Sequence, residues 1–234
     1  MVDIHTHVLY GVDDGAETLE DSLALLKEAK IQGIDTVYAT PHFYTSDVDI
    51  ESHKSNVENN FNNLLGCINS DAYPNVYLGY EVHYFNNIYK SDQLKELTLN
   101  NTEYLLLELD YNDITDKVIN NIEEIRWQQG LKPIIAHIER YHNLKGFKKL
   151  LSIIDHENIF SQITVSSLLK KDRYYKVSKK LIKKGLVDFL ASDMHHIKKR
   201  PPLFSKALEQ LRKDHGFTVS ETLISNSHKI TNSR

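Results

Sequence analysis

Short apolar runs rich in β-branched residues recur along the chain and alternate with amphipathic segments. The alternation is typical of an α/β protein with a parallel sheet, in which helices connect successive strands. The runs are continuously apolar, so both faces of the sheet should be buried. A closed barrel and a doubly wound sheet both satisfy this pattern. The seven predicted strands are Val2–His7, Thr36–Thr40, Val76–Glu81, Tyr104–Leu109, Pro133–His137, Phe160–Thr164 and Val187–Ala191.

The segments between these runs carry apolar residues at helical spacing. Thr18 precedes Asp21 by three residues, which predicts a capping box at the start of the first helix, and Gly33 should end that helix. Gly130 and Gly185 lie where two later helices should stop. Lys170–Lys184 is expected to present a solvated helix face. The predicted helices are Glu20–Gln32, Ile50–Ile68, Asp116–Gln129, Gly146–His156, Tyr174–Lys184 and Ser205–Asp214.

Composition narrows the class of protein. With 234 residues and no recognisable linker or internal repeat, residues 1–234 are expected to form one domain. A net charge of -4 gives no reason to expect nucleic-acid binding. Cys67 is the only cysteine, which fits a reducing compartment. No stretch resembles a membrane span or a signal peptide, so we expect a cytoplasmic protein without membrane insertion.

Ionisable residues follow the apolar runs where each predicted strand ends. In parallel α/β folds these carboxyl ends form one face, where functional sites are built. His5 and His7 are two residues apart, so a strand directs both imidazoles to the same side. Burying so many ionisable groups is costly unless they are paired, and divalent cations would pair them. The nine candidates are His5, His7, Asp14, His42, Glu81, Glu108, His137, Asp193 and His195.

Each candidate alone has an ordinary explanation, because a single histidine such as His42 or His137 is often a core residue and a single glutamate such as Glu81 or Glu108 is often a capping or ion-pair carboxylate. Nine aligned candidates are hard to explain in that way. Five imidazoles and four carboxylates exceed what one ion uses, which indicates two or three ions. A nitrogen and oxygen ligand set without thiolate favours Mn, Fe or Zn over a structural zinc site.

Two arginines point to an anionic substrate. Arg140 follows His137 by three residues, and Arg200 follows His195 by five. A guanidinium beside clustered cations is explained by an anion between them, and arginine is the preferred bidentate partner of phosphate. The residues therefore predict metal-dependent hydrolysis of a phosphomonoester. Cysteine-based phosphate chemistry is excluded, because Cys67 is followed six residues later by Tyr73 and not by arginine.

These motifs resemble the polymerase-and-histidinol-phosphatase (PHP) superfamily. Within it they are most similar to the bacterial manganese-dependent protein-tyrosine phosphatases of capsular and exopolysaccharide operons. The resemblance runs in order from residue 1 to about residue 230. The motifs that carry it are His5-Thr6-His7, Gly11-Val12-Asp13-Asp14-Gly15-Ala16, Ala39-Thr40-Pro41-His42, Gly79-Tyr80-Glu81, His137-Ile138-Glu139-Arg140, Gln162-Ile163-Thr164 with Ser167-Leu168, Ala191-Ser192-Asp193-Met194-His195 and Arg200-Pro201-Pro202.

The resemblance implies a seven-stranded, distorted, TIM-like (β/α) barrel of the PHP type with up to three Mn²⁺ ions. It assigns Arg140 and Arg200 to the phosphate. One departure is Leu109-Asp110 after Glu108, where relatives commonly have Phe-Pro, and Phe43-Tyr44 is a variable position. By motif, one ion would take His5, His7, Glu81 and Asp193, a second would share Glu81 and take Glu108 and His137, and the third would take Asp14, His42 and His195.

The implied substrate is phosphotyrosine on a protein, a tyrosine kinase of a polysaccharide operon, whose dephosphorylation regulates capsular or exopolysaccharide synthesis. Asp14 or His195 is a candidate general acid, although tyrosinate, with a free pKa near 10, is a fair leaving group without one. Alternatives are a small-molecule phosphomonoesterase of the histidinol-phosphate type, a metal-dependent nuclease and an inactive metal-binding scaffold. Four aromatic residues in the loops after the strands are expected to line the substrate rim, namely Tyr44, Tyr84, Phe85 and Tyr111.

Overall fold

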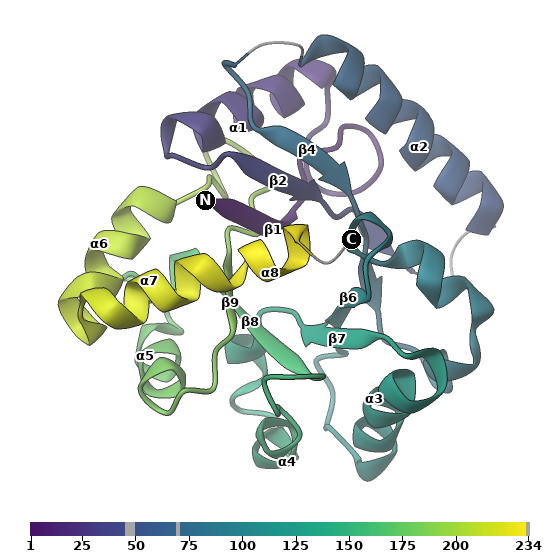
Figure 1. The fold of residues 1–234 in the computed structure, drawn as a ribbon, viewed down its shortest axis with the longest axis vertical. Coiled ribbons are helices and arrows are strands. Elements are labelled where there is room, and N and C mark those ends of the chain that lie inside the picture. Colours follow the sequence, from purple (N-terminus) through teal and green to yellow (C-terminus); the bar gives the residue numbers. More distant parts are fainter. Residues whose placement is uncertain (45–49, 69–70, 233–234) are drawn as a thin grey trace.

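The sheet curls around a common interior, and most of the helices lie outside it (Figure 1). The computed structural model describes residues 1–44, 50–68 and 71–232. Every strand pair in these residues is parallel, as the alternation of strands and helices predicted. The strands are β1 (Val2–Thr6), β2 (Thr36–Ala39), β3 (His42–Phe43), β4 (Asn75–Leu78), β5 (Glu81–His83), β6 (Tyr104–Glu108), β7 (Lys132–Ile135), β8 (Phe160–Thr164) and β9 (Phe189–Ala191).

Each of the seven predicted strands is present, but two chain segments contribute two strands each, so the described residues contain nine. The strands form the orders β1-β2-β4 and β3-β5-β6-β7-β8-β9. The break before β3 lies at Pro41, which has no amide hydrogen to donate. The break before β5 lies at Gly79, where an added Cβ would lie 2.7 Å from Leu99. Hydrogen bonds continue across both breaks, since Gly79 N donates to Ala39 O at 2.9 Å and Glu81 N donates to Pro41 O at 3.1 Å.

The first strand is also hydrogen-bonded to the segment that follows the last one. The amide of Asp193 donates to the carbonyl oxygen of His5 at 2.9 Å, and the amide of His7 donates to that of Met194 at 2.9 Å. Residues at the two ends of the sequence therefore meet at the carboxyl ends of the strands. This is the face that carries the predicted ligands.

Helices connect the strands, and the predicted capping box is confirmed. Asp21 N donates to Thr18 Oγ1 at 3.2 Å, and Thr18 N donates to the Asp21 carboxylate at 3.1 Å. No helix in the described ranges is long and apolar enough to span a membrane. The α-helices are α1 (Leu19–Ile31), α2 (Ile50–Cys67), α3 (Asp116–Gln129), α4 (Phe147–Ser152), α5 (Tyr175–Lys183), α6 (Phe204–His215), α7 (Phe217–Asn226) and α8 (His228–Thr231). Short 3-10 helices are η1 (Ile88–Lys90), η2 (Asp92–Leu97), η3 (Leu99–Asn101), η4 (Ile138–Tyr141) and η5 (Val165–Leu168).

Two helix predictions need correction. The helix predicted over Gly146–His156 ends at Ser152, because Asp155 Oδ1 accepts the amides of residues 157–159 and stabilises a turn instead. The sequence did not predict α7 and α8. Residues 217–231 are rich in Ser, Thr and β-branched residues, which are weak helix formers. These helices form because packing favours them, and Ile230 of α8 is fully buried in the interior of the sheet.

Alternate residues of the strands fill that interior. Tyr104 and Leu106 of β6 belong to the inner apolar cluster, while Leu105 and Leu107 pack outward among the helices. Because the side-chain period of a strand is two, the next inward position on β6 is Glu108, at the carboxyl end. The strand pattern thus places apolar layers below and ionisable residues above them.

Candidate metal centre

Four predicted ligands converge where β1 ends. His5 Nε2 and His7 Nε2 lie 3.2 Å apart, and each lies 3.2 Å from Oε2 of Glu81. Oδ1 of Asp193 lies 3.6 Å from His5 Nε2 and 3.5 Å from His7 Nε2. Adjacent ligands bound to one ion at about 2.1 Å lie about 3 Å apart, so these spacings fit a shared cation.

The other oxygen of Glu81 contacts the second predicted group. Glu81 Oε1 lies 2.9 Å from His137 Nε2, and Glu108 Oε1 lies 3.5 Å from the same nitrogen. Glu81 and Glu108 come from the neighbouring strands β5 and β6, and His137 follows β7. A carboxylate whose two oxygens face two nitrogen clusters is suited to bridging two cations.

The third predicted group lies on the more open side. Asp14 Oδ1 is 3.3 Å from His195 Nε2 and 3.5 Å from His42 Nε2, and the ligand atoms of these three residues and His7 lie within 4.8 Å of one another. His42 Nδ1 lies 3.0 Å from Glu81 Oε2. His42 therefore stands between the second and third groups, whereas the resemblance assigned it to the third alone. The Asp14 side chain is 66% exposed.

Asp13 orients His7 from outside the ligand cluster. Its Oδ2 accepts hydrogen bonds from His7 Nδ1 at 2.7 Å and from the amide of His42 at 3.2 Å, and its Oδ1 accepts the amide of Gly15 at 2.9 Å. This bond leaves His7 Nε2 facing Glu81. The loop folds back so closely that a Cβ at Gly15 would lie 2.1 Å from the His7 carbonyl oxygen, and only glycine fits there.

Gln162 and the Asp193 backbone orient two other imidazoles, and Gln162 also holds the backbone of a third histidine. Gln162 Oε1 lies 3.2 Å from His5 Nδ1 and accepts the amide of His137 at 2.9 Å. The Asp193 carbonyl oxygen lies 2.9 Å from His195 Nδ1 and accepts a hydrogen bond from it. The donated Nδ1 proton leaves a lone pair on His195 Nε2, which suits a metal ligand and not the general acid that the sequence also suggested.

Two of the candidate ligands have backbone conformations that side chains rarely adopt. His137 has φ +33° and Asp193 has φ +53°, both in the left-handed region. Such conformations cost free energy and persist where the surrounding structure fixes them. Both residues follow directly after strand ends, so the left-handed turn redirects their side chains toward the cluster.

Electrostatics keep two imidazoles neutral and one charged. Burial and the neighbouring His7 lower the pKa of His195 to about 3, and burial together with Arg140 lowers the pKa of His137. Neutral imidazole is the form that binds metal. Burial alone would lower the pKa of His7 as well, but hydrogen bonds to Asp13 and Glu81 raise it to about 10. The carboxylates thus stabilise positive charge at the centre.

The donor set and its burial fit divalent cations. His195 Nε2 is buried and has no hydrogen-bond partner among the residues that the structure describes. An unsatisfied buried nitrogen is expensive, and a cation would satisfy it. Burial raises the pKa of Glu81 and Asp193, yet nearby histidines hold both values below their ordinary range, together with Arg140 and Arg200 in the case of Asp193. The carboxylates are therefore ionised, as ligands must be.

Both predicted phosphate-binding arginines converge on the outer face of this cluster. Arg140 and Arg200 each donate from Nη2 to Oδ2 of Asp193, whose Oδ1 faces the imidazoles. They also line a cavity of about 550 Å³ that opens beside the ligands. The remaining residues around this cavity are Tyr111, Thr164, Ser166, Asp172, Arg173 and Tyr174.

The predicted aromatic rim is half right. Tyr111 is 52% exposed and lines the cavity, and Tyr44 is 39% exposed with its ring 5.2 Å from that of His42. Tyr84 is wrong as a rim residue, because it is buried and its hydroxyl accepts a hydrogen bond from Asn121 Nδ2 at 2.7 Å. Phe85 is half-buried and packs against the core, so its place at the rim stays a prediction.

Three residues outside the predicted ligand set contact the ligands. Asp13 lies beside the predicted Asp14, and Gln162 is part of a quoted motif without an assigned role. His83 lies two residues after Glu81, so the strand period could have placed it on the same side. Its Nδ1 lies 3.4 Å from Glu108 Oε2 and its Nε2 lies 2.8 Å from Asp110 Oδ1.

Strand-end histidines and carboxylates, with two arginines that line the adjoining cavity, on a curled parallel sheet define a metal-dependent hydrolase of the α/β class. The chain belongs to the CpsB/CapC family of capsular polysaccharide synthesis, whose model matches residues 1–232. It is 30% identical to the tyrosine-protein phosphatase CpsB of Streptococcus agalactiae serotype III, with 98% of each chain covered.

Solved structures agree with this family. A structure reported for YwqE from Bacillus subtilis and CpsB from Streptococcus pneumoniae, metal-dependent tyrosine phosphatases, matches with a TM-score of 0.84 and 27% identity. The match covers 100% of this chain and 95% of the other. The phosphotriesterase homology protein of Escherichia coli shares only the fold, with a TM-score of 0.54 and 13% identity, and the match covers 98% of this chain and 97% of the other.

Proposed function

We propose that the protein is a metal-dependent protein-tyrosine phosphatase that acts on a phosphorylated tyrosine kinase of a polysaccharide operon in the cytoplasm. The family and its curated phosphatase relatives support this activity. We also propose that the curled sheet is a PHP-type barrel within one domain, with β2 and β3 serving as one strand and β4 and β5 as another. The hydrogen bonds between His5 and Asp193 support that barrel.

The observation that carries the proposal is the division of Asp193. One carboxylate oxygen faces His5 and His7, while the other is held by Arg140 and Arg200. Cations and guanidinium groups therefore lie on adjoining sides of one small region. A phosphoryl group placed there has its charge stabilised from both sides.

We assign the nine predicted ligands to two or three Mn²⁺ ions, for which Fe or Zn could substitute in the same donor set. Ions bound there would supply Lewis acidity that lowers the pKa of water and neutralises phosphate charge. Arg140 and Arg200 would orient the phosphate and bind its oxygens as charge develops. Phenolate can leave unprotonated, so no general acid is required, and Asp14 at the open edge would act as one only when it binds no ion.

The depth of the arginine cavity favours phosphotyrosine over phosphoserine as the substrate. The phosphate of phosphotyrosine extends roughly two strand residues further from the backbone than that of phosphoserine. Arg140 is mostly buried behind the exposed Tyr111, whose ring can stack on the substrate ring. A longer side chain therefore reaches the arginines while its backbone stays outside.

The test is a comparison of kcat/KM for Mn²⁺-loaded protein on matched peptides that differ only in the phosphorylated residue. We expect phosphotyrosine to be preferred at least tenfold over phosphoserine. Histidinol phosphate and single-stranded DNA serve as alternative substrates. Faster turnover of either one, or equal rates on the two peptides, would contradict the proposal.

A further inference from the structure

A second cavity lies outside the metal centre, between α4 and α5. Its volume is about 620 Å³. We name it the α4–α5 groove. Apolar side chains form its floor, namely Leu144, Phe147, Leu151, Val177 and Leu181. Lysines surround it, namely Lys148, Lys149, Lys180 and Lys184.

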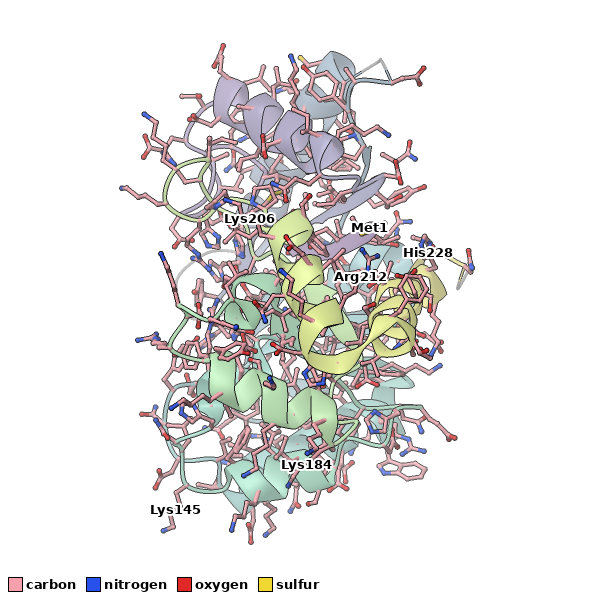
Figure 2. All side chains as sticks on the ribbon, turned by 90° about the vertical axis from the view of Figure 1, so that its left-hand side faces the viewer. Met1, Lys145, Lys184, Lys206, Arg212 and His228 are labelled. Atoms are coloured by element: carbon pink, nitrogen blue, oxygen red, sulfur yellow. The ribbon has the colours of Figure 1, made fainter. Side chains whose placement is uncertain are left out.

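The groove carries positive charge that the protein does not neutralise. Lys149 pairs with Asp116, but Lys148, Lys180 and Lys184 have no carboxylate partner among the described residues. The surrounding sequence is strongly basic, because residues 130–234 contain 21 Lys and Arg against 9 Asp and Glu. Residues 1–129 contain 7 Lys and Arg against 23 Asp and Glu. The overall net charge of -4 is therefore the sum of an acidic first part and a basic second part of the sequence. Figure 2 shows Lys145 and Lys184 toward the same end of this face.

The groove and the cavity at the arginines are lined by neighbouring residues along α5. Tyr174 and Arg173, just before α5, line the arginine cavity, and Val177, Lys180 and Lys184 on the same helix line the groove. The ring of Tyr174 meets the ring of His142, a groove residue, at 5.7 Å. Arg173 lies over the Tyr174 ring at 4.6 Å and has no carboxylate partner in the part of the chain that the structure describes.

We propose that the α4–α5 groove binds an acidic segment of the phosphoprotein substrate, with apolar side chains on the groove floor and carboxylates on the lysines. This inference rests on the proposed function. The concave, apolar floor fits side chains of a peptide better than the flat surface of a bilayer, and the unpaired lysines specify its charge. Arg173 would bind the segment where it leaves the phosphotyrosine.

The geometry sets the spacing. From Tyr174 to Lys184 the helix rises about 15 Å at about 1.5 Å per residue. An extended peptide covers that distance in about five residues. Carboxylates of the substrate should therefore lie about three to five residues beyond the one that contacts Tyr174.

The experiment measures steady-state kinetics of the Mn²⁺-loaded full chain on two phosphotyrosine peptides. One carries Asp, Glu and Leu at the predicted spacing on both sides, and the other has Asn and Gln in place of the acids. The variant K180E/K184E reverses the charge of two of the four groove lysines. The matched control K27E/K206E changes the same net charge at exposed lysines elsewhere. p-Nitrophenyl phosphate reports on the metal centre alone.

We expect the unmodified chain to have an about tenfold lower KM for the acidic peptide than for the neutral one. K180E/K184E should abolish that difference and leave kcat and p-nitrophenyl phosphate hydrolysis unchanged, while the control keeps it. The preference should also decline in about 0.5 M salt, because exposed charges are screened. Equal KM values for the two peptides, or the same loss in the control, would overturn the proposal.

Two further measurements separate the alternatives. Fluorescence anisotropy with the unphosphorylated acidic peptide tests the groove even if the chain hydrolyses no phosphate ester, which would refute the proposed function alone. Co-sedimentation with phosphatidylglycerol vesicles tests a membrane surface. Vesicle binding that K180E/K184E abolishes, without any peptide preference, would overturn the peptide proposal.

Discussion

The amide of Asp193 donates to the carbonyl oxygen of His5 at 2.9 Å, and the carboxylate of Asp193 lies 3.6 Å from the imidazole of the same His5. These two residues lie far apart in the sequence. Their backbone hydrogen bond connects the first strand to the segment after the last strand, and their side chains both belong to the candidate metal centre. Metal binding and folding should be coupled through this contact.

The first prediction tests that coupling. Mn²⁺ at about 100 times its Kd should stabilise the protein by about 2.7 kcal/mol for each independently bound ion. The variant D193N keeps the backbone hydrogen bond but loses a ligand charge, so it should show a smaller increase in Tm and bind at least one ion fewer. Calorimetry with and without EDTA and metal analysis provide the readouts. Equal Mn²⁺ shifts for the two proteins would contradict the coupling.

The second prediction separates the arginines from the ligands. R140A should retain its metal while kcat/KM on a phosphotyrosine peptide decreases about 10²-fold or more, because a transition-state contact is lost. H137A should instead lose metal, since His137 Nε2 lies 2.9 Å from Glu81. Full activity of R140A would show that the phosphate is bound elsewhere.

The third prediction concerns Asp13. D13A removes the carboxylate that holds His7 Nδ1 at 2.7 Å, so metal affinity should decrease about 10- to 100-fold. D13N can still accept a hydrogen bond from His7 Nδ1, so its metal affinity should decrease less. Mn²⁺ titration of the three proteins measures the difference. If D13A bound Mn²⁺ as tightly as the unmodified chain, the positioning role would be wrong.

The fourth prediction concerns stability against acid. Asp214 of α6 accepts Lys179 Nζ at 2.6 Å and Tyr175 Oη at 2.7 Å, both from α5. Burial would raise its pKa, but these hydrogen bonds lower it to about 2. A depressed folded-state pKa stabilises the protein above the unfolded value near 3.9, and the contribution is lost as pH decreases toward 2.

D214A should therefore lower the free energy of unfolding by about 1–2 kcal/mol at pH 7 and by less near pH 3. E209A removes an exposed carboxylate of the same helix that pairs with Lys213, and as the control it should change stability little at either pH. Urea denaturation of both variants at pH 7 and near pH 3 measures their free energies of unfolding. A D214A effect that is constant with pH would rule out the ionised carboxylate as its source.

Local sequence determined much of the fold. The strand runs, the Thr18 capping box and the helix over Asp116–Gln129 follow from periodicity, caps and burial along short stretches. The nine predicted ligands also came from local pattern, because carboxyl ends of parallel strands share one face. Their side chains do lie together in the structure. Helices α7 and α8 were missed because weak helix formers adopt that conformation only when packed.

Tertiary structure alone decided which groups contact which. No local pattern places Asp193 between His5 and two arginines, packs Leu99 against Gly79, or buries Tyr84. It also placed the arginine cavity and the lysine-edged groove next to one another along α5. The sequence by itself determined the residue types and their strand-end positions, since these depend on neighbours within a few residues. The distances between them depend on how distant segments pack, and only the folded chain specifies those.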